Sequence, residues 1–239
     1  MALRIGIFGR GRLGSLVEAA VRRDADLELV WALGRDEQPS GEVDVAVDVT
    51  HADAVGPHLA WARDTGTDLV IGTTGWSTDL LGTVTDTDDS GIGVLVAPNF
   101  SLSVALMRRL ATVIGGYAVH APEPVDLAVT DTHHRGKVDA PSGTAAMLRD
   151  ALALASGRAA DEVQTTSLRM GTVVGRHSVL YESASESLVI THEAHTREVF
   201  AAGALAAARW VHGRPGTHTV DDWAHDQLHH LFSGETPHP

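Results

Sequence analysis

The sequence contains no cysteine, a single lysine and few aromatic residues, which make up 5% of its 239 residues. The absence of cysteine excludes disulfide bonds, a catalytic thiolate and metal sites with cysteine ligands, and it fits a reducing compartment. The longest apolar run, Phe200–Ala208, is far shorter than the roughly 18 residues that a membrane-spanning helix needs. Arg4 and a glycine cluster interrupt the first residues, which therefore do not read as a secretory signal. We expect a soluble, cytoplasmic protein.

The chain is acidic, with 31 Asp and Glu against 18 Lys and Arg, a net charge of −13. This charge disfavours binding to nucleic acid or to an anionic membrane. All the basic residues are arginine except Lys137. A single retained lysine suggests a site that needs a compact ammonium group, although chance could also leave one lysine.

Short apolar strands alternate with helical patterns through the first hundred residues. We predict strands at Leu3–Phe8, Leu27–Leu33, Val43–Val49, Asp68–Ile71 and Gly93–Ala97. We predict helices after Gly14, at His51–Thr65 and at Thr78–Thr87. This alternation indicates right-handed βαβ units, and hence an α/β fold with a Rossmann-like parallel sheet.

The pattern changes after residue 99. Helices are predicted at Ser103–Gly115, Ser142–Ala155, Ala201–His212 and Val220–Phe232, and strands at Val125–Thr132, Thr165–Met170, His177–Ser183 and Ser187–Glu193. Successive strands are typical of an α+β layer with a mixed or antiparallel sheet. We expect a dinucleotide-binding domain at 1–99, completed by 201–239, with a substrate-binding and oligomerisation domain inserted at 100–200.

A glycine motif, Gly9-x-Gly11-x-x-Gly14, follows the first strand and opens the first helix. In this context the glycines let the backbone approach a pyrophosphate, and the helix N-terminus offers unpaired N–H groups. Arg10 and Arg12 strengthen the phosphate interpretation, although an ordinary tight turn would also use glycine here.

The end of the second strand bears on cofactor choice. An acidic residue there holds the ribose hydroxyls of NADH, whereas an arginine suits the 2′-phosphate of NADPH. The chain has Arg35 after Gly34, so we predict that NADPH is preferred and that NADH is possible. In the alternative interpretation Asp36 takes the place of the acid.

The segment from Asp131 to Ala145 is the densest in chemically useful residues. His133 and His134 end a strand, Lys137 follows, and Ser142–Thr144 opens a helix. Hydroxyls, helix amides and an ammonium can bind a carboxylate, and an imidazole can deliver a proton. The segment predicts a small carboxylate substrate that must gain a proton. No metal is expected, because His192 and His195 lack the spacing of a zinc motif.

The run from His133 to Ala145 resembles the signature of dihydrodipicolinate reductases, also called 4-hydroxy-tetrahydrodipicolinate reductases. The resemblance covers most of the chain. It includes further matches at Ile71–Gly75, Ala97–Ser101, Arg169-x-Gly171, Gly175-x-His177, Ile190–His192, Arg197 and Phe200–Ala201-x-Gly203. It implies NAD(P)H-dependent reduction of 4-hydroxy-tetrahydrodipicolinate, via dihydrodipicolinate, to tetrahydrodipicolinate in diaminopimelate and lysine biosynthesis.

The resemblance also implies roles for individual residues. His133 is the proton donor, and Lys137 assists it while binding a substrate carboxylate. Substrate is held by His134, Lys137, Ser142, Gly143 and Thr144. Cofactor is held by Gly9, Arg10, Gly11, Arg12, Leu13, Gly72, Thr73, Thr74, Ala97, Pro98, Asn99 and Phe100. The family is usually a homotetramer assembled through the sheet of the inserted domain.

The chain departs from the usual family pattern at several places. Its glycine loop is one residue shorter than the commonest form, with Leu13 for the usual methionine, Val49 stands where phenylalanine is common, and Ala202 replaces a common asparagine. Asp131 stands where glutamate is usual, and the stretch from Ala155 to Arg169 is shortened. Two alternatives remain at this point. One is a paralogous NADP-dependent reductase of another imine or keto carboxylate, and the other is a non-catalytic NADP-binding module.

Overall fold

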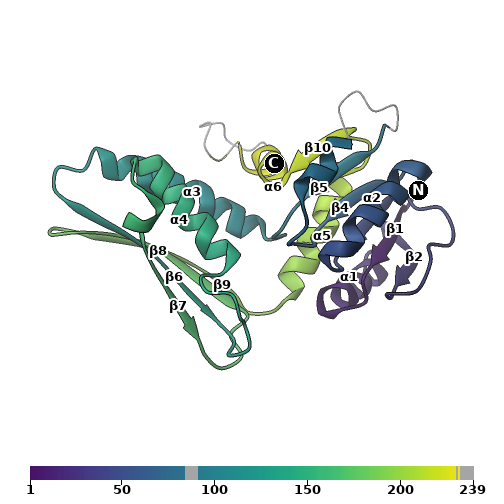
Figure 1. Cartoon of the computed structure of the whole chain (residues 1–239), viewed down its shortest axis with the longest axis horizontal. Coiled ribbons are helices and arrows are strands. Elements are labelled where there is room, and N and C mark those ends of the chain that lie inside the picture. The colour runs from purple at the N-terminus through teal and green to yellow at the C-terminus, as the bar shows by residue number, and fades with distance from the viewer. Residues whose placement is uncertain (84–90, 230, 232–239) are drawn as a thin grey trace. The chain divides into compact units, whose positions relative to one another are not determined.

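The structure is a computed structural model that describes residues 1–83, 91–229 and 231 (Figure 1). The chain divides into two compact units. The first unit comprises Met1–Ser101 and Arg197–Pro239, and the second unit comprises Leu102–Thr196. Each unit contains one sheet and its own hydrophobic core.

The first unit contains a six-stranded parallel sheet in the order β10-β5-β4-β3-β1-β2. The strands are β1 (Leu3–Phe8), β2 (Leu27–Leu33), β3 (Val45–Asp48), β4 (Asp68–Ile71), β5 (Gly93–Val96) and β10 (Gly216–Thr219). Strands β3 and β4 are buried along their whole length, as expected for parallel strands that are covered on both faces. The predicted Rossmann-like sheet is thus confirmed.

Strand β10 is the element that the sequence pattern does not reveal. Its residues are Gly-Thr-His-Thr, which carry no large apolar side chain, and it follows a turn rich in glycine and proline. It pairs with β5 at the edge of the sheet, where a strand needs less apolar surface.

In the described part of the first unit there are four α-helices: α1 (Arg12–Arg23), α2 (Ala52–Thr65), α5 (Glu198–Val211) and α6 (Val220–Leu228). Helices α1 and α5 pack against each other, and α2 lies on the opposite face of the sheet (Figure 1). This follows from right-handed crossovers, because β1 to β2 and β3 to β4 run in opposite directions across the sheet. Trp61 of α2 packs on the aromatic side chains of Phe8 and Trp31 from the sheet.

Two helix predictions need correction. The helix predicted at Thr78–Thr87 is a 3-10 helix, η1, at Thr78–Thr83, and residues 84–87 lie outside the described part of the chain. Its sequence contains Gly82 and repeated threonines, which have low helix propensity. Helix α6 ends at Leu228, and the predicted end at Phe232 is also outside the described residues.

The second unit contains a four-stranded mixed sheet in the order β7-β6-β8-β9, as predicted. Strand β7 (Gln164–Arg169) is parallel to β6 (Val125–His133), and β8 (Gly175–Ser183) and β9 (Ser187–Ala194) continue the sheet antiparallel. Helices α3 (Leu102–Val119) and α4 (Gly143–Ser156) pack together over one face of the sheet, and η2 (Ala160–Glu162) precedes β7. Tyr181 and Leu148 lie in the core between helices and sheet.

Helix α3 is longer than the predicted Ser103–Gly115, because it continues through Gly116 to Val119. Its length and composition would also allow it to cross a membrane. Core helices of water-soluble domains meet the same criterion, and α3 buries Met107, Ala111 and Ile114 in the core of the second unit. One face of α3 therefore packs in the core of the second unit.

Candidate active site

The second unit brings the chemically active residues of its sheet into one row. Side chains two apart on a strand share a face, so Asp131 and His133 of β6 lie on the side covered by the helices. Register pairs Asp131 with Ser167 of β7 and with His177 of β8. Asp131, His133 and His177 are all at least nine-tenths buried.

Asp131 is fully buried and surrounded by donors. The Ser167 hydroxyl donates to Oδ1, Nη1 of Arg169 lies 3.2 Å from Oδ2, and Nδ1 of His133 lies 2.9 Å from the same oxygen. Burial alone would raise the pKa of Asp131, but the hydroxyls of Ser167 and Ser142 and the charge of Arg169 outweigh it and lower the pKa. Asp131 is therefore a carboxylate at neutral pH.

His133 is the imidazole at the end of β6. Burial has the largest effect on the pKa of His133 and lowers it. The positive charges of Lys137 and Arg169 lower this pKa further, whereas the Asp131 carboxylate raises it. Within the described residues no hydrogen-bond partner is aligned on Nδ1, so its 2.9 Å approach to Asp131 becomes an ion pair when the ring is protonated. The ring thus sits between groups that drive its protonation in opposite directions.

Lys137 lies in the loop between β6 and α4. Its Nζ is 2.7 Å from Oδ1 of Asp139, and this ammonium lowers the pKa of that carboxyl group. Backbone hydrogen bonds shape the loop, since the Lys137 amide donates to the carbonyl of His134 at 3.1 Å. An ammonium has three N–H donors, so the pair with Asp139 leaves Lys137 able to bind a further anion.

Helix α4 begins directly after this loop. Ser142 is its N-cap, and the buried Ser142 hydroxyl accepts a hydrogen bond from the Ala145 amide at 3.2 Å. The same oxygen lies 3.2 Å from Nε2 of His177. Gly143 is exposed, and the first turn contains no acidic residue that would offset the positive end of the helix. This end of the helix can therefore receive a carboxylate.

His177 stays neutral in this arrangement. Burial, reinforced by the neighbouring His133, lowers the pKa of His177 to about 4. Asp131, His133 and His177 place ligand-type atoms within 4.8 Å of one another, a spacing that a metal ion could use. However, Arg169 already neutralises the Asp131 carboxylate, and Ser167 occupies its other oxygen. The cluster fits a hydrogen-bonded network better than a metal site.

The glycine loop of the first unit has the geometry of a phosphate cradle. Gly9 has φ of 102°, a conformation that favours glycine, and a Cβ on Gly14 would lie 1.7 Å from the Gly9 carbonyl oxygen. Around Gly11, the N-cap of α1, a Cβ would meet no atom within 4 Å. No described side chain caps this helix, and its first turn has no acidic residue. These features fit the pyrophosphate of a dinucleotide.

A cavity of about 1060 Å³ extends from this loop to the ends of β2 and β3. It is lined by the predicted cofactor residues Gly9, Arg10, Gly11 and Arg35, and by Glu37. The Glu37 carboxylate accepts a hydrogen bond from the Gly34 amide. From the sequence, Asp36 is the alternative for the acidic residue that holds the ribose hydroxyls. In the structure the carboxylate that contacts the end of β2 is that of Glu37, which the sequence does not indicate.

A second buried carboxylate, Asp48, ends β3 in the first unit. It accepts hydrogen bonds from the hydroxyls of Thr50 at 2.6 Å and Thr73 at 2.7 Å, and lies 2.8 Å from Nδ1 of His58. Burial acts to raise the pKa of Asp48, but these donors outweigh it and lower the pKa. Neither Asp48 nor His58 was predicted as a site residue, because their partners come from separate loops.

The two remaining cofactor loops follow adjacent strands. Gly72–Thr74 follows β4 and Ala97–Phe100 follows β5, and the Phe100 ring packs so closely on Gly72 that a Cβ there would lie 2.5 Å away. The Ala97 amide donates to the Ile71 carbonyl at 2.9 Å. Both loops therefore lie at the carboxyl edge of the sheet, where open α/β sheets bind ligands.

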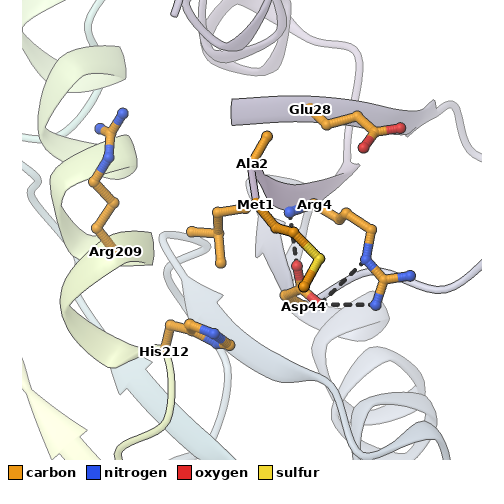
Figure 2. Close-up of a pocket in the computed structure, with 8 residues that line it drawn as sticks. Met1, Ala2, Arg4, Glu28, Asp44, Arg209 and His212 are labelled. Carbon is orange, nitrogen blue, oxygen red and sulfur yellow. Dashed lines mark hydrogen bonds and ion pairs between the residues drawn. The ribbon is translucent and has the colours of Figure 1, made fainter. Parts of the chain in front are cut away.

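A further cavity, of about 760 Å³, lies at the opposite, amino-terminal edge of this sheet. Figure 2 shows Arg4 hydrogen-bonded to Asp44 in this cavity. Nη2 of Arg4 lies 2.8 Å from Oδ1 of Asp44. Arg209 pairs with Asp24, and His212 lies 3.1 Å from Asp68. Because Arg4, Arg209 and His212 already have carboxylate partners, the cavity offers little to an anionic ligand.

Most of the chain is similar in sequence to known proteins. Models of the C-terminal and N-terminal parts of dihydrodipicolinate reductase match residues 101–223 and 37–100. A 4-hydroxy-tetrahydrodipicolinate reductase of Alkalilimnicola ehrlichii is 36% identical, with 93% of this chain and 98% of the relative covered. One of Pseudomonas fluorescens is 38% identical, with 88% and 94% covered.

Solved structures agree on the fold. A dihydrodipicolinate reductase from Paenisporosarcina sp. TG-14, solved with dipicolinate, aligns with a TM-score of 0.77 at 22% identity, covering 92% of this chain and 98% of that one. An engineered D-amino acid dehydrogenase bound to NADP+ aligns with a TM-score of 0.53 at 13% identity, covering 95% and 98%.

Proposed function

Because this chain belongs to the dihydrodipicolinate reductase family, we propose that it reduces 4-hydroxy-tetrahydrodipicolinate, via dihydrodipicolinate, to tetrahydrodipicolinate in diaminopimelate and lysine biosynthesis. The observation that carries the proposal is the second unit's set of His133, Lys137 and the α4 N-terminus. A protein that only bound a dinucleotide would need none of these groups.

The residues of the second unit serve the substrate. Hydride addition to a conjugated imine ring leaves a negative charge on the ring, which protonation neutralises. His133 is the group that delivers this proton. Lys137 binds one carboxylate of the dicarboxylate substrate. The N-terminus of α4, at Gly143 and Thr144, binds the same substrate molecule. Ser142 acts by capping the helix, and half-buried His134 completes the site.

The residues of the first unit serve a pyridine nucleotide, which supplies the hydride when bound. The glycine loop, Gly9–Leu13, holds the pyrophosphate. Gly72–Thr74 and Ala97–Phe100 hold the nicotinamide half. Asp48 keeps the first of these two loops in place through Thr73.

NADPH is the preferred cofactor in this proposal. Arg35 lines the cavity beyond the glycine loop and can pair with a 2′-phosphate, while the Glu37 carboxylate is tied to the Gly34 amide. Kinetics with both cofactors test this directly. The expected result is a higher kcat/KM for NADPH that Arg35→Ala abolishes, and a higher kcat/KM for NADH in the unmodified protein would contradict it.

A coupled assay tests the reaction itself. The synthase that makes the substrate is mixed with this protein and NADPH, and loss of NADPH absorbance is followed. We expect turnover that depends on the synthase and is lost in His133→Ala. Cofactor binding without turnover would instead favour a related reductase of another imine or keto carboxylate.

The protein is proposed to be a homotetramer that assembles through the second unit. The helices cover one face of its sheet, and the other face exposes Leu168 on β7 and Val189 on β9, with half-buried Leu180 between them on β8. These apolar side chains lie among threonine and serine residues on the same face, and exposed apolar groups on an uncovered sheet face suit an interface. Light scattering after size-exclusion chromatography should give a tetramer, and Val189→Asp should dissociate it. A monomeric unmodified protein would refute the assembly.

A further inference from the structure

We propose that Asp131 is the positioning residue of the reductase site, because it orients His133 and, through Arg169, holds the loop that carries Lys137. The inference rests on the proposed function. In this role Asp131 acts through His133 and Arg169 and need not contact the substrate.

The first part of the argument is the position of Asp131. Its side chain is fully buried on the same face of β6 as His133, two residues away. Oδ2 lies 2.9 Å from His133 Nδ1, and the Ser167 hydroxyl binds the other oxygen. A carboxylate held in this way beside Nδ1 orients the ring and stabilises its doubly protonated form, whose Nε2–H is the donor that the proposed proton transfer needs.

The second part is Arg169, which connects Asp131 to the loop. Its Nη1 lies 3.2 Å from Asp131 Oδ2 and 2.8 Å from the Leu168 carbonyl oxygen, and its Nη2 donates to the carbonyl of Asp139. Asp139 in turn holds the Lys137 ammonium at 2.7 Å. One guanidinium thus links the carboxylate beside the proton donor to the backbone of the substrate-binding loop.

The third part is electrostatic. His133 faces Asp131 on its own strand, Arg169 on β7, His177 on β8 and Lys137 from the loop, with His192 beyond His177 on β9. Burial, Lys137 and Arg169 lower the pKa of His133, and Asp131 opposes them. Without Asp131, the ring would lose its proton at a lower pH and would be a poorer proton donor near neutrality.

Asp131→Asn tests this assignment with a readout that a merely structural residue would not move. We expect kcat to fall about 100-fold or more, and its alkaline limb to move to lower pH by about one pH unit or more. The limb moves to lower pH because His133 can donate a proton only below its pKa, and the substitution lowers the pKa of His133. Asp131→Glu should restore the pH profile. Asp150→Asn removes a carboxylate from an exposed arginine pair and should leave both kcat and profile unchanged.

Arg169→Gln provides the test if Asp131→Asn does not fold. Removing this cation should move the alkaline limb to higher pH, and freeing the Lys137 loop should raise KM for the substrate about tenfold. A pH profile and KM equal to those of the unmodified protein would overturn the proposal, as would Asp131→Asn with an unmoved alkaline limb.

Failure of the proposed function is recognised separately. If the unmodified protein shows no turnover, the His133 pKa is measured by NMR titration of the unmodified, Asp131→Asn and Arg169→Gln proteins. The pKa should fall in the first variant and rise in the second. Equal values in all three would refute the role of Asp131 without reference to activity.

Discussion

Two buried carboxylates, Asp48 in the first unit and Asp131 in the second, have similar hydrogen-bond partners but different charged groups around them. Each is fully buried, ends or nearly ends a strand, accepts from hydroxyls and lies within 3 Å of the Nδ1 of a histidine. Both have a lowered pKa, because their donors outweigh the effect of burial. A carboxylate–histidine pair is therefore not by itself a sign of proton chemistry.

The difference lies in the cations around each pair. Among the described residues, Asp48 has His58 as its basic partner, and the Thr50 and Thr73 hydroxyls complete its shell. Asp131 also faces Arg169, and Lys137 acts on the adjacent His133. The first arrangement fixes loops, whereas the second balances charges around a ring that can exchange a proton.

The largest expected effect separates the two histidines. His133→Ala should lower kcat roughly 100- to 10,000-fold, because general acid catalysis contributes about that factor. His58→Ala, the matched variant, should retain kcat at saturating NADPH, since His58 binds Asp48, stacks on Phe8 and lines the cofactor cavity but delivers no proton. Steady-state kinetics on both variants measure this. Equal losses of kcat would erase the distinction between the two pairs.

The next effect concerns Lys137, which acts on the Asp131–His133 pair and has no counterpart among the described residues around the Asp48–His58 pair. Lys137→Ala should lower kcat and raise KM for the substrate about 10- to 100-fold, the range for losing a charge-assisted hydrogen bond. Lys137→Arg keeps the charge but not the compact geometry, and should recover only part of the loss. An unchanged KM in Lys137→Ala would contradict the carboxylate-binding role.

Much of both units could be predicted from sequence because their signals are local. The alternation of strands and helices predicts the parallel sheet, and Gly9-x-Gly11-x-x-Gly14 lies where a strand gives way to a helix. His133, Lys137 and Ser142 are within ten residues, so any fold that ends a strand at His133 keeps them close.

The carboxylate networks were beyond sequence reasoning because their members are distant along the chain. Thr73 reaches Asp48 from 25 residues away, and Arg169 reaches Asp131 from 38. Only the pairing of β3 with β4, and the parallel register of β7 on β6, brings them together. Nothing local distinguishes Asp131 from a solvated acid.

A smaller effect is expected from Asp48→Asn. The variant leaves the Thr50 and Thr73 donors without a full acceptor, which should cost about 2 kcal/mol of unfolding free energy. Loosening the loop at Thr73 should raise KM for NADPH several-fold and leave the pH profile of kcat unmoved. Urea unfolding and pH-resolved kinetics measure these changes. A moved alkaline limb would place Asp48 among the groups that tune proton transfer.

The smallest effect is the pH dependence of that stability. A carboxyl group with a lowered pKa in the folded state binds fewer protons folded than unfolded, so its contribution is complete above the unfolded pKa of about 3.9 and is lost as pH falls through the lower folded value. The stability gap between the unmodified protein and Asp48→Asn should thus be constant near neutrality and shrink below about pH 4. Asp150→Asn, at an exposed arginine pair, should show little gap at any pH. If the Asp48→Asn gap instead widened in acid, Asp48 would be protonated in the folded protein, and the similarity between the two carboxylates would fail.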